Sequence, residues 1–330
     1  MKNNTRSMIH FELDRMAESL DIDILGRSVA DRMINLSAMC SGDESLRVLV
    51  KDHVINSARY MAKTPHGPRD CFDHKNVVKI FFYYLVRGFL DAYERPFVKR
   101  QHWMPFCMIS KFASENARRH HHTVEILNGS FQWGEYVCNQ RIIHDEFIHE
   151  TPHYSQIIEV IFSYIESDYD ISLRDIRNPE VDNSLMSIRN GAALSLFAII
   201  QYFVRNPDYN KKRIDGDAHS MLEAIFDSID HVAATFKYGV VFSHKRVHMP
   251  IVPSASVKAF MSGESHHIVL PLSRHVSLIL SDKDISATLK RDKIVRKHVH
   301  RLITDAYTNG GVIFGMDKAR AEDIIRSIGI

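Results

Sequence analysis

The stretch Lys99-Arg100-Gln101-His102-Trp103-Met104-Pro105-Phe106 separates the most apolar run of the chain from a region rich in His and carboxylates. Proline restricts the backbone and the aromatic neighbours add apolar surface, so the stretch predicts a rigid corner that carries one titratable ring. A lone histidine in such a place is more often packed than reactive. A functional role for His102 therefore depends on partners from elsewhere in the chain.

Upstream of this corner, residues 77–90 read VVKIFFYYLVRGFL and include Lys79 and Arg87. The run is shorter than the ~20 residues that a membrane-spanning helix needs, so it predicts a buried helix. The N-terminus carries acidic residues where a signal peptide needs a continuous apolar core, which argues against export. We expect residues 1–95 to form a helical N-terminal segment and residues 96–330 to form the second domain.

Downstream, the hydrophobic pattern alternates between helical and strand periods. The Asn128-Gly129 step between two apolar runs is typical of a β-hairpin. Helical spacing predicts helices over residues 153–168, 184–205, 218–236, 284–308 and 317–328. Short β-prone runs occupy residues 238–252, 268–272 and 276–280. The predicted class is α+β, mainly helical with a small antiparallel sheet.

Composition narrows the function classes. The chain has 330 residues, of which 45% are hydrophobic, so it can bury a large core. Lys and Arg number 42 against 40 Asp and Glu, a balance that argues against nonspecific coating of nucleic acid or membrane. The chain is rich in histidine, with 20, and its four cysteines form no CxxC pair, which favours reduced thiols in the cytoplasm.

Two glutamates form the first candidate site. Glu159 and Glu166 are seven residues apart on the predicted 153–168 helix, so two helical turns place them on one face. Paired carboxylates can hold a divalent metal ion or divide acid and base roles, whereas the alternative is a solvated helix face. The surrounding residues are mostly apolar, and a buried carboxylate needs a partner. Arg205 is the natural partner.

A basic segment forms the second candidate site. The residues Lys290, Arg291, Lys293, Arg296, Lys297, His298, His300 and Arg301 give the 284–308 helix a strongly basic face. We expect Arg291, Lys293, Arg296 and Lys297 to contact nucleic acid, with a merely hydrated face as the alternative. The GxxxxGK[ST], GxGxxG and GxSxG signatures are absent from the sequence.

Four short motifs, taken in order, resemble a family of bacterial and phage proteins known as domain of unknown function 4238. The motifs are the His102-Trp103-Met104-Pro105-Phe106 step, the two-glutamate helix at residues 158–166, the Gln201-to-Pro207 helix end, and Pro271-Leu272-Ser273. The resemblance covers about residues 98–315. It implies that His102, Glu159, Glu166, Gln201 and Arg205 meet in space.

The chain departs from the family pattern at one place. Relatives usually have Ser-Asp-x-Pro after a strand, where this chain has Ser243-His244-Lys245-Arg246. If that Asp binds metal or takes part in catalysis in relatives, His244 is its replacement here as a ligand, or the activity is lost.

Two functional hypotheses follow. In the first, the chain is a cytoplasmic, metal-assisted phosphodiesterase or nuclease acting in phage–host conflict. His102 is then the general base or a ligand, Glu159 and Glu166 hold a divalent metal ion, and Arg205 binds phosphate. In the second, the chain is a non-enzymatic binding or inhibitor protein for a phage or host protein, and the same residues form a buried structural network. The pattern predicts no membrane contact and no particular oligomeric state.

Overall fold

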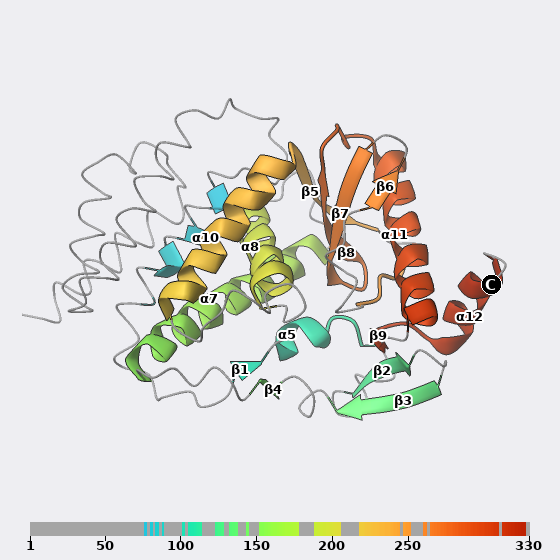
Figure 1. Ribbon diagram of the computed structural model, residues 1–330, viewed down its shortest axis with the longest axis horizontal. Coiled ribbons are helices and arrows are strands. Elements are labelled where there is room, and N and C mark those ends of the chain that lie inside the picture. Colours follow the sequence, from blue (N-terminus) through green and yellow to red (C-terminus); the bar gives the residue numbers. More distant parts are fainter. Residues whose placement is uncertain are drawn as a thin grey trace, which may run out of the picture. The chain divides into compact units, whose positions relative to one another are not determined.

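The computed structural model describes residues 76–77, 80–81, 83–85, 88, 101–102, 105–113, 123–128, 132–137, 143–144, 152–177, 188–205, 218–244, 247–251, 260–262, 265–309 and 312–327 (Figure 1). Helices make up most of these residues and antiparallel strands make up most of the rest, so the predicted α+β class is confirmed. The predicted boundary near residue 95 lies outside the described residues. The division into residues 1–95 and 96–330 therefore stays a prediction.

The chain forms two compact units, each of which combines separate stretches of sequence. Unit 1 consists of Met1–Gln101, Asp145–Phe197 and Arg213–His231, and unit 2 consists of His102–His144, Ala198–Lys212 and Val232–Ile330. Two helices, α8 (Ile188–Ile199) and α10 (Ala218–Thr235), contain a boundary between the units. We describe each unit by itself.

Aromatic contacts hold the helices of unit 1 together. The described residues between 76 and 88 are helical, and their apolar side chains are buried, as the 77–90 run predicts. Phe81 packs edge-on against Phe226 of α10, with ring centroids 5.0 Å apart. Tyr169 of α7 (Pro152–Arg177) stacks on Phe197 of α8 at 3.8 Å. Burial of such rings contributes about 1.5–3 kcal/mol each to folding.

Helix α7 is longer than the sequence pattern indicates. The predicted end at residue 168 is wrong, because α7 continues to Arg177. Tyr169, Leu173 and Ile176 continue the apolar spacing beyond Asp168, and all three side chains are buried. The Tyr84 hydroxyl donates a 2.6 Å hydrogen bond to Asp168, which satisfies this carboxylate within the helix rather than at its end.

Helix α8 ends in a change of helical period. The predicted 184–205 helix is described as α8 followed by a π-helical turn, η4 (Ile200–Val204). The Arg205 N–H donates to the carbonyl of Ile200, five residues back, at 2.8 Å. This wider turn ends directly before Asn206-Pro207, where the proline opposes further helix.

A three-stranded sheet in unit 2 confirms the predicted hairpin. Strands β2 (Thr123–Asn128) and β3 (Gln132–Val137) pair antiparallel, with Asn128 opposite Gln132. The third strand, β9 (Val312–Phe314), pairs with β2 and was not predicted. Two further short strands, β1 (Gln101–His102) and β4 (Ile143–His144), pair with each other, and a short helix, α5 (Phe106–Ile109), follows β1.

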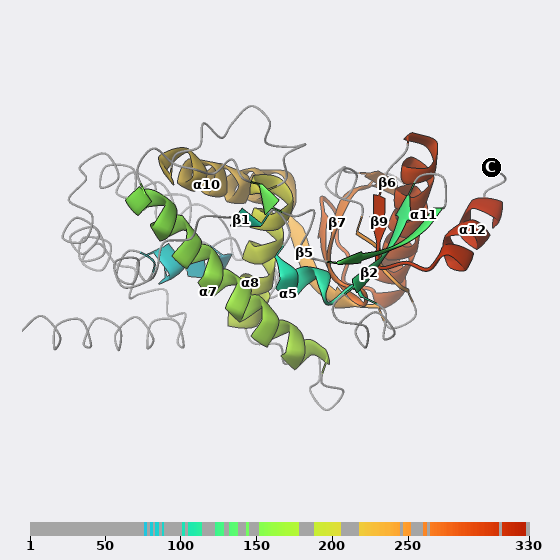
Figure 2. The same cartoon turned by 90° about the horizontal axis from the view of Figure 1, so that it is seen from below.

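A four-stranded antiparallel sheet forms the centre of unit 2. Its order is β5-β8-β7-β6, from strands β5 (Tyr238–Ser243), β8 (Val276–Ser281), β7 (Ser265–Ser273) and β6 (Phe260–Ser262). Helix α11 (Thr288–Asn309) lies along this sheet, and α12 (Lys318–Ser327) follows β9 (Figures 1 and 2). Val240, Val269 and Ile279 from three neighbouring strands share one buried cluster with Val295, Val299 and Leu302 of α11.

None of the described helices combines the length and the low charge that a membrane-spanning segment requires.

Candidate nucleic-acid interface

Helix α11 has two chemically different faces. Its buried positions recur at helical spacing and form the stripe that packs on the sheet, namely Ile294, Val295, His298, Val299, Leu302, Ile303 and Ala306. The stretch 289–301 carries a single carboxylate, Asp292, against Lys290, Arg291, Lys293, Arg296, Lys297 and Arg301. Packing of the apolar stripe therefore decides which of these cations reach solvent.

Two of the cations fasten the start of α11 to the preceding loop. The Lys290 ammonium donates to the carbonyl of Asp284, and Arg291 Nε donates to the carbonyl of Ile285 at 2.6 Å. The Arg291 guanidinium also lies over the Phe242 ring, 5.9 Å from its centroid. Arg291 is half-buried, so its predicted contact with nucleic acid competes with this packing role.

Two other basic residues of α11, His298 and Arg301, are fully or partly buried. His298 is fully buried, and Arg301 is half-buried with one guanidinium nitrogen 3.3 Å from His298 Nδ1. Burial, and then the charge of Arg301, lowers the pKa of His298 well below its usual value, so the ring is neutral. The expectation that His298 belongs to the basic face is wrong, because the stripe that packs on the sheet includes this residue.

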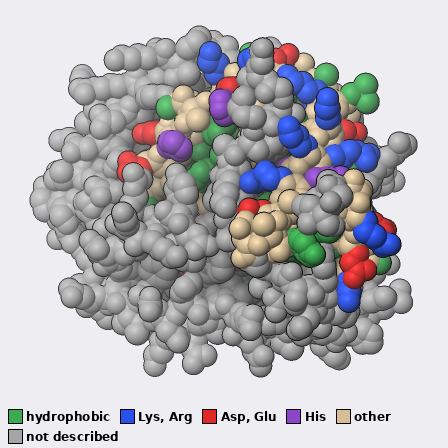
Figure 3. Space-filling model, turned by 45° about the vertical axis from the view of Figure 1, so that its right-hand side comes forward, with side chains coloured by type: hydrophobic (Ala, Val, Ile, Leu, Met, Phe, Trp, Pro, Cys, Tyr) green, Lys and Arg blue, Asp and Glu red, His purple; other side chains and the backbone are tan. Residues whose placement is uncertain are grey.

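The remaining basic residues are exposed and close together. Four exposed residues lie at helical spacing on one side of α11: they are Lys293 and, three, four and seven positions later, Arg296, Lys297 and His300. We call these four residues the α11 basic face. A space-filling view shows several Lys and Arg side chains close together on one face (Figure 3).

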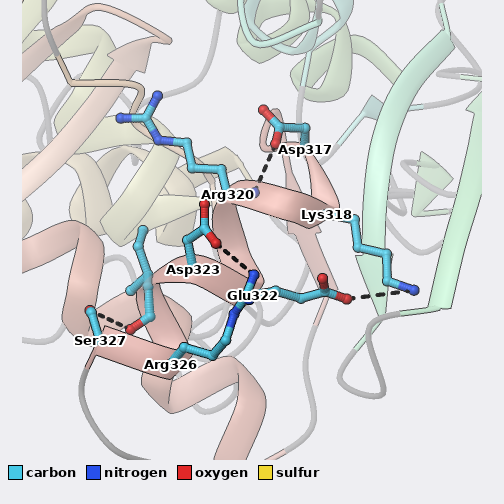
Figure 4. Close-up of polar contacts among 8 residues, drawn as sticks. Asp317, Lys318, Arg320, Glu322, Asp323, Arg326 and Ser327 are labelled. Atoms are coloured by element: carbon cyan, nitrogen blue, oxygen red, sulfur yellow. Dashed lines mark hydrogen bonds and ion pairs between the residues drawn. The ribbon is translucent and has the colours of Figure 1, made fainter.

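Helix α12 provides a contrast within the same unit. Its exposed cations are neutralised along the helix: Lys318 pairs with Glu322 at 3.7 Å, and Arg326 pairs with Asp323 at 2.6 Å (Figure 4). Within the described part of the chain, neither Lys293 nor Arg296 forms an ion pair. The positive charge of the α11 basic face is therefore less compensated than that of α12.

The two predicted glutamates lie on one helix. Glu159 and Glu166 are both on α7 in unit 1, and both are half-buried. Each takes part in an interaction within the structure. The pairing of a glutamate with Arg205 stays a prediction.

The other three predicted cluster residues belong to unit 2. His102 ends strand β1, Gln201 is buried within η4, and Arg205 is the half-buried residue that caps η4. The convergence of His102, Gln201 and Arg205 with Glu159 and Glu166 joins residues of two units, and it stays a prediction.

The predicted metal ligand His244 has both ring nitrogens engaged. Nδ1 donates to the carbonyl of Val247 at 2.8 Å, and Nε2 therefore accepts from the Ser277 hydroxyl at 2.9 Å. Metal ligation by His244 would require one of these hydrogen bonds to break. Among the described residues, no group of three or more His, Cys, Asp or Glu side chains is arranged to hold a metal ion.

Sequence reasoning missed a second group of basic side chains in unit 2. His248 and His275 lie edge-on with ring centroids 4.9 Å apart, and Arg274 and Arg320 contribute positive charge around His248. These residues come from three separate segments and form no local motif. Only the alternation of the 247–251 segment, with Val247, Met249 and Ile251 apolar, indicates that His248 faces away from the core.

No protein-family model, curated protein or solved structure matches this chain. The resemblance to domain of unknown function 4238 accordingly stays a prediction.

Proposed function

We propose that this protein binds nucleic acid through the α11 basic face. The observation that carries the proposal is the exposure of Lys293, Arg296 and Lys297 on one side of a helix whose opposite side is fixed to the sheet. Lysine and arginine neutralise backbone phosphates and release counterions, which favours binding without dependence on sequence.

The dimensions of the face suit a phosphate backbone. From Lys293 to His300 the helix rises by roughly 10 Å, because each residue adds about 1.5 Å. One strand of a duplex carries a charge about every 3.4 Å along the axis, so the face spans about three phosphates. The expected mode is backbone contact rather than base reading.

Cleavage of the bound nucleic acid is a second candidate function. The observation in its favour is that Gln201 and Arg205 lie in and next to a π-helical turn, a geometry that is frequent at functional sites. Residues suited to a divalent metal ion are Glu159 and Glu166, and Arg205 would bind phosphate. As part of this second candidate function, we propose that the protein acts in the cytoplasm, in phage–host conflict.

Binding can be measured by fluorescence anisotropy with a labelled DNA duplex and a labelled single strand of equal length. For about three phosphate contacts, the logarithm of the duplex binding constant should fall with the logarithm of salt concentration with a slope near −3. Lys293→Ala and Arg296→Ala should each weaken binding to all sequences alike and reduce that slope by about 1.

Arg326→Ala is the matched control, because Arg326 is an exposed cation of the same unit that already pairs with Asp323. It should leave affinity and slope unchanged. Equal losses for Arg326→Ala and Arg296→Ala, or binding without a salt slope, would contradict the proposed interface. Binding of an acidic protein in place of nucleic acid would favour the inhibitor hypothesis.

A further inference from the structure

A second cationic cluster in unit 2 is independent of the α11 basic face. It consists of His248 from the 247–251 segment, Arg274 and His275 from the turn between β7 and β8, and Arg320 from the first turn of α12. We call these residues the His248 cluster. One carboxylate, Asp317, lies beside it and caps α12 by accepting from the Arg320 N–H at 2.9 Å.

Backbone hydrogen bonds hold the three segments in place. The Met249 N–H donates to the carbonyl of Arg274 at 2.9 Å, and Ile251 exchanges two hydrogen bonds with Phe314. Val247 and Met249 belong to the buried cluster that the sheet shares with α11, and Ile251 is also buried. Alternation along an extended chain therefore turns His248 to the opposite side, against the His275 ring.

Two groups of the cluster lack partners. His248 Nδ1 is buried, and no described residue forms a hydrogen bond with it. Arg320 is half-buried, and its guanidinium has neither a hydrogen bond nor an ion pair with any described residue. Its side chain extends away from the Lys318–Glu322 and Asp323–Arg326 pairs (Figure 4). A buried ring nitrogen left without a hydrogen bond, as His248 Nδ1 is, costs free energy unless a ligand completes it.

The field at His248 is positive. Burial, and then the charges of Arg274, Arg320 and His275, lower the pKa of His248 to about 4. The carboxylate of Asp317 acts in the opposite direction. An anion at this place would be attracted by two guanidinium groups and would stabilise the protonated ring.

We propose that the His248 cluster is a binding site for a phosphate-type oxyanion, with the Arg320 guanidinium and the His248 ring as its direct ligands. Arginine is suited to this role because its planar fork of donors matches the oxygens of a phosphate. Arg274 and His275 supply further positive charge. The site shares no residue with the α11 basic face, so it goes beyond the proposed function.

The first test uses sulfate, which is a dianion throughout the pH range of interest. Titration of the full chain at constant ionic strength, followed by NMR of backbone and side-chain N–H groups, should show saturable binding with a Kd of about 1 mM. Arg320→Gln should weaken it by about tenfold or more, whereas Arg326→Gln on the same helix should bind like the unchanged chain. No saturation up to about 50 mM, or equal binding by Arg320→Gln, would overturn the proposal.

The second test uses the proton linkage. Because a bound anion favours the protonated form of His248, sulfate should bind about tenfold more tightly at pH 5.5 than at pH 7.5. His248→Gln should bind more weakly and lose this pH dependence. A pH dependence that survives in His248→Gln, or that is absent from the unchanged chain, would remove His248 from the site and overturn the proposal.

A third test separates two sources of the oxyanion. Inorganic phosphate and a short oligonucleotide with a 5′-phosphate are compared, with the unphosphorylated oligonucleotide as control. Tighter binding of the phosphorylated oligonucleotide, lost in Arg320→Gln, indicates a phosphate ester, whereas equal binding of inorganic phosphate indicates the free ion. Lys293→Ala should leave sulfate binding intact, so failure of one site is distinguishable from failure of the other.

Discussion

The Nε2 atom of His244, directly after β5, lies 2.9 Å from the hydroxyl oxygen of Ser277 in β8, and both side chains are buried. Because Nδ1 donates to the Val247 carbonyl, the ring is held neutral with its proton on Nδ1. Protonation would require Ser277 to give up its donor role in a buried place. The stability of unit 2 is therefore linked to pH.

We expect acid to destabilise unit 2 through this ring. Burial lowers the pKa of His244 to about 4, against about 6.5 in the unfolded chain. The unfolded state then binds more protons between these values. The stabilisation that the neutral His244 ring contributes is complete above pH 6.5 and declines as pH falls from about 6.5 to about 4, by about 3 kcal/mol in total. Denaturant unfolding at several pH values measures this decline in the free energy of unfolding.

His244→Asn is the control for this pH dependence, since the Asn amide can still donate to Val247 but does not titrate. The variant should lose part of the decline below pH 6.5. The buried rings of His267 and His298, whose pKa values burial also lowers, should keep the rest. An unchanged decline in His244→Asn would contradict the assignment.

Tyr202→Phe should lower the free energy of unfolding by about 1–2 kcal/mol. The Tyr202 hydroxyl donates to the carbonyl of Pro271 at 2.7 Å in a buried place, and its removal leaves that carbonyl without this donor. Tyr238→Phe is the control, because Tyr238 is half-buried and its hydroxyl has no hydrogen bond with a described residue. Equal effects of the two variants would contradict a specific role for the Tyr202 hydroxyl.

Gly315→Ala should destabilise the chain by about 2 kcal/mol or more. Gly315 has a φ of 81°, and a Cβ placed there would lie 2.8 Å from the carbonyl oxygen of Phe112. Gly315→Asn separates the two causes, because Asn tolerates the left-handed backbone but brings the same Cβ. Thermal unfolding should show both variants below the unchanged chain; full stability of Gly315→Asn would contradict the close contact with Phe112.

Glu159→Gln tests the candidate cleavage activity. If Glu159 holds a divalent metal ion, the variant should lose metal-dependent hydrolysis of nucleic acid while its free energy of unfolding changes by less than about 1 kcal/mol. A buried structural network instead predicts a loss of about 3–5 kcal/mol. Glu166→Gln should behave in the same way as Glu159→Gln. Unchanged activity together with unchanged stability would contradict both roles.

Much of the fold could be predicted because its signals are local. The 218–236 helix, the β7 and β8 strands and the hairpin at Asn128-Gly129 all follow from hydrophobic period and turn chemistry. The misplaced end of α7 shows the limit of this reasoning, since the polar Asp168 and Asp170 and the exposed Ile171 obscure the apolar period of Tyr169 and Leu173. Strand β9 was missed because its pairing with β2 joins distant segments.

The amino-acid sequence by itself determined that α11 is an amphipathic, strongly basic helix, because spacing along a helix depends only on neighbours. Only the tertiary structure decided which cations are available. Lys290 and Arg291 fasten the start of the helix to the preceding loop, and His298 lies on the buried side of the helix. The residues of the α11 basic face are therefore the ones left in solvent. The His248 cluster exists only in the folded chain, since its residues come from segments that hydrogen bonds bring together.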